Sequence, residues 1–140
     1  MKKISVQKMH PEAILPTRAH SDDAGMDLYS LEDVLIPVGL GKMARTGIAI
    51  ALDIGFVGLI ADRSSLAKKG LKTAGGVIDA GYRGEIQVVF WNLSSEDILI
   101  KKGERMAQLL TLPIATPVIV ESQDLGTTTR GAGGFGSTGR

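Results

Sequence analysis

The chain of 140 residues contains no cysteine, two histidines and only 4% aromatic residues. Without cysteine, neither disulfide bonds nor a thiol nucleophile can form. His10 and His20 lie in polar N-terminal sequence and are too few for a histidine-based zinc site. Any metal should therefore be a hard cation bound by oxygen atoms.

The chain also lacks a strong net charge and a long apolar run. Its formal net charge is +1, which gives no basic field for nucleic-acid binding. No run approaches the length of a membrane span, and the first residues lack the apolar region of a signal peptide. We therefore expect a cytoplasmic protein that binds neither nucleic acid nor membranes, with one domain large enough to bury a core.

Short apolar runs separated by turn residues predict an all-β fold. Ile48, Ile50 and Leu52 alternate with alanines, which is typical of a half-buried strand. The other predicted strands are the runs at 56–61, 85–92, 98–100, 106–112 and 118–120. Their spacing is typical of a β-barrel or a jelly roll.

One short helix is expected at residues 66–69. Ser64 or Ser65 could cap its start, and Gly70 could end it. A helix start that carries Arg63 and two hydroxyl groups suits an anion. Simple capping beside a solvated arginine fits the same residues equally well.

The last eleven residues, 130–140, include five glycines. Such a segment cannot build a core, but it can serve as a flexible arm in which Arg130 supplies charge and Phe135 a stacking face. A glycine-rich dinucleotide fingerprint is excluded because no helix can follow Gly136, and the P-loop lysine is replaced by Ser137. The alternative is a disordered tail. We predict a body at residues 1–125 and an arm at 126–140.

Three further segments carry polar side chains that could form a site. Asp27 follows a tight turn, and residues 75–84 predict a hairpin that presents Asp79 and Tyr82. Gln108 is the polar exception in a predicted strand, and a buried glutamine must be hydrogen-bonded. Taken singly, each of these residues could equally shape a turn, cap the core or satisfy the backbone.

Five segments together resemble, in order, the five motifs of the trimeric dUTP pyrophosphatase (dUTPase) family: 24–28, 62–66, 75–84, 103–109 and 130–140. The resemblance implies a jelly-roll-like, distorted β-barrel subunit with a flexible arm, in a homotrimer with active sites at subunit interfaces. It implies Mg²⁺-assisted attack of water on the α-phosphorus of dUTP, which yields dUMP and pyrophosphate. This reaction would limit uracil in DNA and supply dUMP for dTMP synthesis.

The resemblance also implies roles for individual residues. Asp79 would be the catalytic base, and the ring of Tyr82 would lie beneath the deoxyribose. The residues that would offer groups to uracil are Gly76, Val77, Ile78 and Gln87, and Thr73 falls where some bacterial members have a uracil-pocket asparagine. The residues that would hold phosphates or metal-bound water are Arg63, Ser64, Ser65 and Gln108.

The arm and the metal complete this implied site. The arm residues that would close on the terminal phosphates are Arg130, Gly136, Ser137 and Thr138, and Phe135 would stack over uracil. Mg²⁺ would have no direct protein ligand, with Asp27 and Gln108 contacting it through water. Asp62 departs from the family pattern, because it replaces a common proline and adds negative charge near a polyphosphate.

Two other functions remain as alternatives. The related dCTP deaminases have a catalytic glutamate at the position of Val89, and valine cannot relay protons. A protein that binds nucleotides for signalling could share the dUTPase fold, although Asp79 and a complete arm favour an enzyme.

Overall fold

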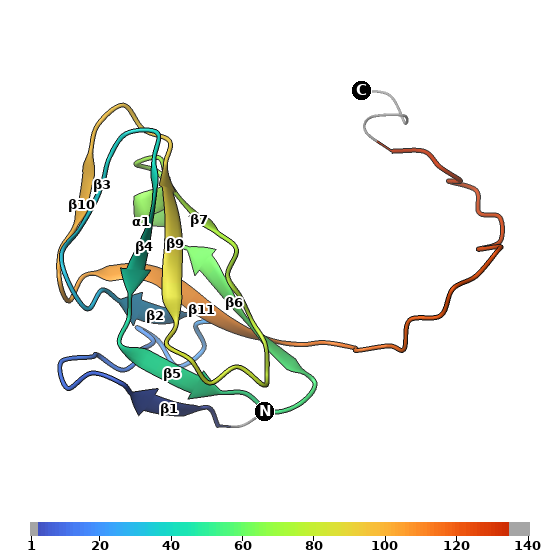
Figure 1. Cartoon of the computed structure of the whole chain (residues 1–140), viewed down its shortest axis with the longest axis horizontal. Coiled ribbons are helices and arrows are strands. Elements are labelled where there is room, and N and C mark those ends of the chain that lie inside the picture. Colours follow the sequence, from blue (N-terminus) through green and yellow to red (C-terminus); the bar gives the residue numbers. More distant parts are fainter. Residues whose placement is uncertain (1–2, 135–140) are drawn as a thin grey trace.

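The computed structural model describes residues 3–134, whose packed part consists of short antiparallel strands and one helix (Figure 1). The first six strands are β1 (Ser5–Lys8), β2 (Met26–Tyr29), β3 (Val34–Ile36), β4 (Gly41–Arg45), β5 (Ile48–Ala51) and β6 (Phe56–Asp62). Helix α1 (Ser64–Ala67) and the strands β7 (Leu71–Ala74), β8 (Val77–Ile78), β9 (Gln87–Asn92), β10 (Ile98–Ile100) and β11 (Arg105–Pro113) follow. The predicted all-β, jelly-roll-like fold with one short helix is confirmed.

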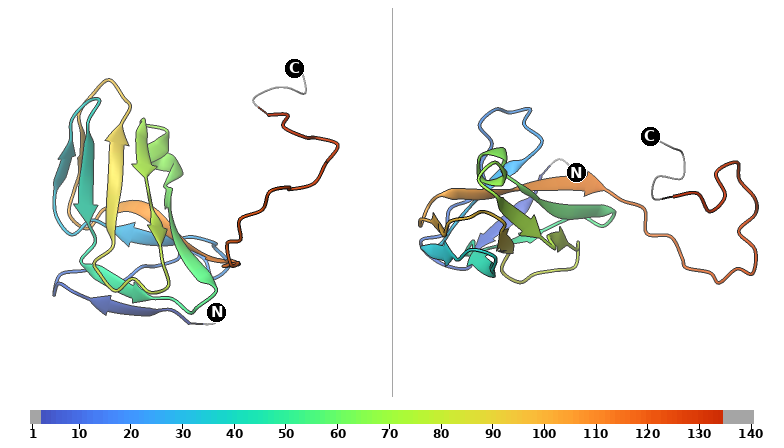
Figure 2. Two further views of the ribbon diagram at one scale, coloured as in Figure 1. Left: turned by 45° about the vertical axis from the view of Figure 1, so that its right-hand side comes forward. Right: turned by 90° about the horizontal axis from the view of Figure 1, so that it is seen from above.

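The strands form four separate antiparallel sheets rather than one continuous sheet. The largest has the order β2-β11-β6-β8, and a second has the order β4-β9-β7. The pairs β1-β5 and β10-β3 flank them, as two further views show (Figure 2). Because β11 lies between β2 and β6, it joins segments from the beginning and the middle of the chain.

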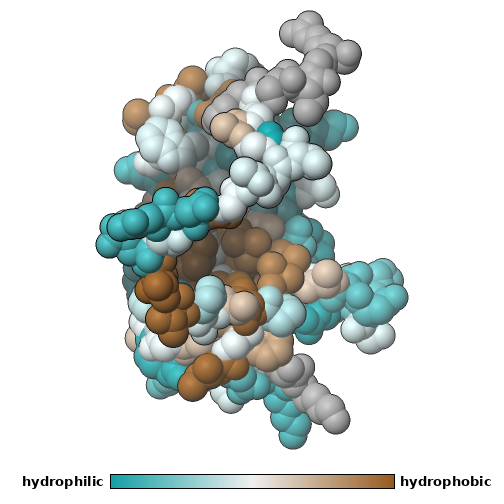
Figure 3. Space-filling view, turned by 90° about the vertical axis from the view of Figure 1, so that its right-hand side faces the viewer, coloured by the Kyte–Doolittle hydropathy of each residue, from teal (hydrophilic) through white to brown (hydrophobic). Residues whose placement is uncertain are grey.

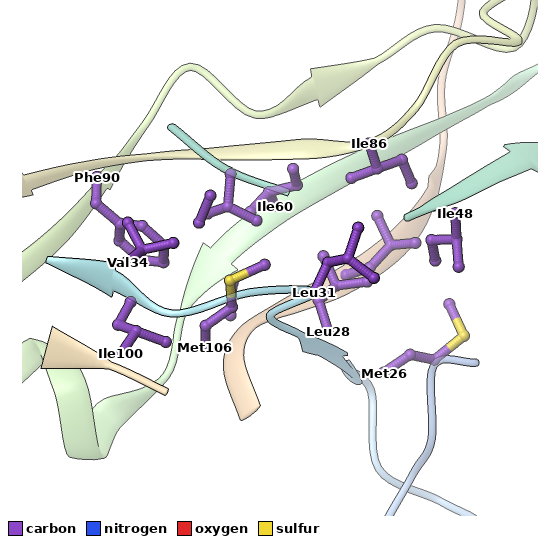
Figure 4. Packing of buried hydrophobic residues seen from close by; sticks show 14 of the residues in the cluster. Met26, Leu28, Leu31, Val34, Ile48, Ile60, Ile86, Phe90, Ile100 and Met106 are labelled. Carbon is purple, nitrogen blue, oxygen red and sulfur yellow. The ribbon is translucent and has the colours of Figure 1, made fainter. Parts of the chain in front are cut away.

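One hydrophobic core fills the space between these sheets (Figure 4). Side chains from β2, β5, β9 and β11 meet there, and Leu28, Ile48, Phe90 and Met106 are almost completely buried. Burial of such side chains supplies the main driving force for folding. The core therefore fixes the strand ends on which the polar site residues lie.

Asn92 is a buried polar residue whose hydrogen bonds connect the end of β9 to neighbouring segments. Its Nδ2 donates to the backbone oxygens of Ile36, at 2.9 Å, and Glu96, at 2.8 Å. Its Oδ1 accepts from the backbone N–H and the hydroxyl of Ser94. The full hydrogen-bonding capacity of the amide is used, as burial of a polar group requires.

Two local predictions are wrong. Residues 118–120 form no strand, and their side chains are 79–97% exposed, because no neighbouring strand in the described chain pairs with this run. Helix α1 begins at Ser64, and Arg63 is its N-cap without a side-chain hydrogen bond. Since Ser64 and Ser65 lie inside the helix, neither occupies the flanking position from which a side chain caps.

The sequence patterns also do not predict strands β1 to β4. All four are short, and β1, β2 and β4 contain polar residues. The last strand, β11, ends at Pro113, and the next residue, Ile114, donates its N–H to the oxygen of Gly55 at 2.8 Å. From there the chain leaves the packed part as an extended, exposed segment (Figure 2). The division of the chain at residue 125 stays a prediction. Within residues 3–134, no helix is long and apolar enough to span a membrane.

Candidate functional site

The predicted hairpin is formed by β7 and β9, and the segment that connects them contains a further short strand, β8. Strands β7 and β9 pair with each other, whereas β8 between them turns away and pairs with β6. Gly75 and Gly76 allow this turn through their positive φ angles of 68° and 93°. A Cβ atom at Gly76 would lie 3.0 Å from the Cβ of Ile60, so the backbones approach closely here.

Beside this connection lies a cavity of about 420 Å³, here called the hairpin pocket. Its lining residues are Met43, Gly76, Val77, Ile78, Asp79, Tyr82, Glu85, Gln87 and Val89. Six of the predicted site residues are thus brought together, and Asp79 is exposed at this pocket. An exposed carboxylate can bind and deprotonate a water molecule.

The ring of Tyr82 is held against the end of the same loop. Its hydroxyl donates to the backbone oxygen of Glu85 at 3.0 Å. Gly84 leaves room for the ring, since a Cβ atom there would lie 2.4 Å from the tyrosine oxygen. With 45% of its surface exposed, Tyr82 forms a pocket wall and does not cap the core.

A second cavity, of about 330 Å³, lies at the start of α1 and is called the arginine pocket. Its lining residues are Ala19, Asp23, Ala24, Gly25, Asp27, Arg63, Ser64, Arg105 and Gln108. Asp27 accepts from Nε of Arg63 at 2.9 Å and from Nη1 of Arg105 at 3.2 Å. Each guanidinium keeps further N–H groups that can donate to phosphate oxygens.

Arg105 is a pocket residue that the sequence analysis missed as a candidate. Its segment, 103–109, was predicted to contribute to the site, but only Gln108 was named as a candidate residue. Arg63 also donates to the backbone oxygen of Arg105 at 3.0 Å, so the two arginines are fixed to each other as well as to Asp27. In the sequence, Arg105 was recognisable only as a cation just before an apolar run. Its closeness to Asp27 follows from the pairing of β11 with β2.

Gln108 is held in one orientation at this pocket. Its Nε2 donates to the backbone oxygen of Asp62 at 2.8 Å, which confirms that the polar exception in β11 is hydrogen-bonded. Gly25 provides the space, since a Cβ atom there would lie 2.1 Å from Oε1 of Gln108. Any larger residue at position 25 would displace the glutamine side chain.

Asp62 faces away from the arginine pocket, toward β7. Its carboxylate accepts from the backbone N–H and the hydroxyl of Thr73, at 2.7 and 2.6 Å, and from Nζ of Lys72 at 2.6 Å. Burial alone would raise the pKa of Asp62, but the hydrogen bonds from Lys72 and Thr73 outweigh it, and the pKa is lowered. The extra charge expected near a polyphosphate is therefore paired with Lys72.

The remaining predicted residues lie apart from both pockets or outside the described part. Thr73, whose hydroxyl is bound to Asp62, and the exposed Ser65 line neither pocket. Arg130 is exposed and donates to the backbone oxygen of Gly133 at 2.9 Å. Phe135, Gly136, Ser137 and Thr138 lie outside the described residues. The hairpin and arginine pockets have no lining residue in common.

Two residues of the arginine pocket, Asp27 and Gln108, carry oxygen acceptors beside the guanidinium groups of Arg63 and Arg105. In residues 3–134, no three His, Asp or Glu side chains are grouped as direct metal ligands. Asp27 and the side-chain oxygen of Gln108 offer oxygen acceptors, which suit Mg²⁺ in its hydrated form. These two residues are the ones that the sequence analysis named for contacts through water.

The fold and the two pockets define a jelly-roll-like β protein with a carboxylate-bearing hairpin and a second pocket lined by two arginines. The family model described as dUTPase matches residues 11–139. The chain belongs to the dUTPase family.

Individual relatives agree with this assignment. A deoxyuridine 5'-triphosphate nucleotidohydrolase of Rhodococcus erythropolis is 47% identical over 97% of this chain and 85% of its own length. A mutant dUTPase of Staphylococcus bacteriophage 80alpha with dUpNHpp superposes with a TM-score of 0.90, at 30% identity and full coverage of both chains. A mutant dUTPase from phage phi11 of S. aureus has a TM-score of 0.83 at 26% identity, over 89% of this chain and 99% of its own.

The Asp62 contacts predict a pH-dependent contribution to stability. Asp62→Asn should lower the free energy of unfolding at pH 7 by about 1–2 kcal/mol, because it removes a charge-assisted pair. Since the folded pKa is lowered, the carboxylate stabilises fully above its unfolded value of about 3.9 and loses this effect as the pH falls through the folded value.

Urea unfolding of wild type and variant at pH 7 and at decreasing pH measures this difference. The gap between the two proteins should shrink in acid. Asp53→Asn, at an exposed turn position, is the matched control and should change stability little. A gap that stays constant down to pH 3 would contradict the role of the Asp62 charge.

Proposed function

We propose that the chain hydrolyses dUTP to dUMP and pyrophosphate, with Asp79 as the base. The observation that carries this proposal is the hairpin pocket, in which an exposed carboxylate, the ring of Tyr82 and the backbone of residues 76–78 lie together. Family membership supports it, and the structure of the bacteriophage 80alpha relative includes dUpNHpp. Such an activity would limit uracil in DNA and supply dUMP for dTMP synthesis.

Asp79 would orient a water molecule and accept its proton as the water attacks the α-phosphorus. The new bond joins the water oxygen to phosphorus, and the bond from phosphorus to the bridging oxygen of pyrophosphate breaks. In-line attack needs the phosphates to be fixed and their charge balanced. Donors on Arg63, Ser64 and Gln108 in the arginine pocket would serve this purpose, and Arg105 adds a second guanidinium. Ser65, next to the pocket in sequence, would add a hydroxyl.

Magnesium fits the same scheme. A phage phi11 dUTPase relative was solved with details of the coordination of a structural Mg(II) ion. In this chain, Asp27 and Gln108 would hold the ion through water, and the bound ion would balance the charge of the triphosphate. Asp27 would also keep both arginines in place, whether or not the ion is bound.

The hairpin pocket would select the base and the sugar through different groups. The backbone of Gly76, Val77 and Ile78, with Gln87 beside it, would pair with uracil, and cytosine would leave a buried donor unpaired. The ring of Tyr82 would occupy the space that a 2′-hydroxyl needs. Thr73 would act on the uracil side only indirectly, through its position on β7, because its hydroxyl is bound to Asp62.

We further propose a homotrimer in which one subunit supplies the hairpin pocket and another the arginine pocket. The support is that the two pockets of one chain share no lining residue, while phosphate attack needs both sets of groups around one substrate. The arm at 126–140, with Arg130, Phe135, Gly136, Ser137 and Thr138, would close the site. The protein would act in the cytoplasm, without nucleic-acid or membrane partners.

Deamination is the weaker alternative. Val89, at the position of the deaminase glutamate, lines the hairpin pocket as a half-buried apolar side chain. It offers no group for proton transfer.

The first prediction concerns the base. Asp79→Asn should retain binding of dUTP but lower kcat by at least about a hundredfold, because an amide cannot accept the proton of the attacking water. Pyrophosphate release and calorimetric binding of a non-hydrolysable dUTP analogue measure the two effects. Asp53→Asn is a matched control with the same chemical change at an exposed turn. Near-normal turnover of Asp79→Asn would remove Asp79 from the role of base.

The second prediction concerns sharing of the site between subunits. Asp79→Asn and Arg63→Ala should each be nearly inactive, whereas trimers assembled from an equal mixture should regain roughly one quarter of the wild-type sites. Each regained site would combine Asp79 of one chain with Arg63 of another. A mixture of Asp79→Asn with Asp79→Ala is the control and should stay inactive. No recovery in mixed trimers, checked by light scattering, would place both pockets of a working site in one chain.

The third prediction concerns the arm. Removal of residues 130–140 should leave thermal unfolding unchanged, because the segment lies beyond the last strand, β11. The same truncation should sharply lower kcat/KM for dUTP, since a closing arm excludes water and adds phosphate contacts. A truncated protein with full activity would show that the segment is a passive tail.

A further inference from the structure

We propose that Glu85 and Arg45 form a positioning pair that holds the ring of Tyr82 and thereby sets discrimination against ribonucleotides. This inference rests on the proposed function, in which Tyr82 contacts the sugar. Neither Glu85 nor Arg45 was identified as a site residue from the sequence. The pair joins the loop that carries Asp79 and Tyr82 to the end of β4.

The two side chains make several contacts with each other. Nε of Arg45 lies 3.2 and 3.1 Å from the two carboxylate oxygens of Glu85, and Nη2 lies 3.0 Å from Oε2. The backbone N–H of Gly47 donates to Oε1 at 2.8 Å. The Glu85 side chain is 14% exposed and the Arg45 side chain 44%, so the carboxylate is the restricted partner and the guanidinium remains partly in solvent.

The neighbouring backbone strengthens this anchor. The N–H and the hydroxyl of Thr46 both donate to the oxygen of Ile86, at 3.3 and 2.6 Å. The N–H of Ile86 donates to the oxygen of Ile48 at 2.8 Å. Hydrogen bonds thus fix residues 85 and 86 to residues 46–48, between β4 and β5. Glu85 directly follows the loop at 79–84.

The position of the Tyr82 ring depends on the backbone of Glu85. The backbone oxygen of Glu85 accepts a hydrogen bond from the tyrosine hydroxyl, and the ring lies against Gly84, where a Cβ atom would be 2.4 Å from the tyrosine oxygen. A shift of the Glu85 backbone would therefore move the acceptor and the ring together. Since the ring would exclude the 2′-hydroxyl by sterics alone, a small displacement is enough to admit UTP.

A purely electrostatic role for the pair makes a different prediction. Glu85 lines the hairpin pocket, and its carboxylate would repel a polyphosphate if it were not paired. The hydrogen bonds and charge of Glu85 raise the pKa of Arg45, so the guanidinium stays charged. If neutralisation were the whole effect, loss of the pair would change KM for every nucleotide alike and leave the ratio between UTP and dUTP unchanged.

The test measures kcat/KM for dUTP, UTP and dTTP in wild type, Glu85→Gln and Arg45→Gln. Glu85→Gln keeps an acceptor for the N–H of Gly47 and removes only the ion pair. Both variants should lower discrimination against UTP by about tenfold and change discrimination against dTTP by less than about twofold. Glu12→Gln, which breaks the exposed pair with Lys102, is the control and should alter neither ratio. Equal changes in both ratios, or in neither, would overturn the proposal.

A double-mutant cycle separates positioning from general loosening of the fold. In a Tyr82→Phe background, which lacks the hydroxyl bound to Glu85, the Glu85→Gln change should add little to the loss of sugar discrimination. Fully additive effects would show that Glu85 does not act through Tyr82. Thermal unfolding identifies any variant that fails to fold, and Arg45→Gln then serves as the second way to break the same pair.

A spectroscopic readout does not need enzymatic activity. The chain has two tyrosines, so fluorotyrosine labelling gives two ¹⁹F resonances, and Tyr82→Phe assigns them. The Tyr82 resonance should shift or broaden in Glu85→Gln and stay unchanged in Glu12→Gln. An unchanged resonance would overturn the positioning role. A wild type that releases no pyrophosphate from dUTP would instead overturn the proposed function.

Discussion

The position of β11 between β2 and β6 is the constraint on which the arginine pocket depends. Its register sets Gln108 opposite Asp27 on one side and opposite Ala61 on the other. The register shifts between Arg105 and Ala107, so Arg105 lies opposite Tyr29, from where it reaches the Asp27 carboxylate. Because antiparallel pairing fixes which residues face each other, a shift of one residue would turn Gln108 away from the backbone of Asp62. The hydrophobic residues on either side of Gln108, which are buried in the core, make such a shift costly.

The hairpin pocket depends instead on two places where the backbone approaches a neighbour too closely for a side chain. At Gly76 the chain passes against Ile60 and turns into β8, and at Gly84 it passes against the ring of Tyr82. Between them, β8 pairs with β6 while β7 and β9 pair with each other, which opens the space lined by Asp79. Figure 3 shows hydrophobic side chains around a hollow on the face toward which the C-terminal segment extends. In the hairpin pocket, the polar groups of the loop lie beside the apolar residues Met43, Val77, Ile78 and Val89.

Local sequence signals predicted the parts of the site that local structure determines. The glycines and the aspartate of residues 75–84 predict a tight loop, and the alternation in β11 reveals Gln108 as an exception. The sequence did not predict Arg45, Glu85 and Arg105, because their contacts join segments that are distant in the chain. The direction of the Asp62 side chain could not be predicted either, since it depends on where β7 lies. The predicted strand at 118–120 failed for the related reason that apolar, β-branched residues form a strand only beside a partner.

Asp62 connects the two pockets within one chain. Its backbone oxygen holds Gln108 at the arginine pocket, while its carboxylate holds Thr73 on β7, the strand that leads into the hairpin pocket. Both pockets are thus built on the end of β6, yet they share no lining residue. A phosphate chain and the base that activates water must meet within a few ångströms, and the homotrimer proposed above would bring the two kinds of pocket together from different subunits. Under the proposed function, the strands of the single chain prepare two half-sites, and assembly is the step that creates a catalyst.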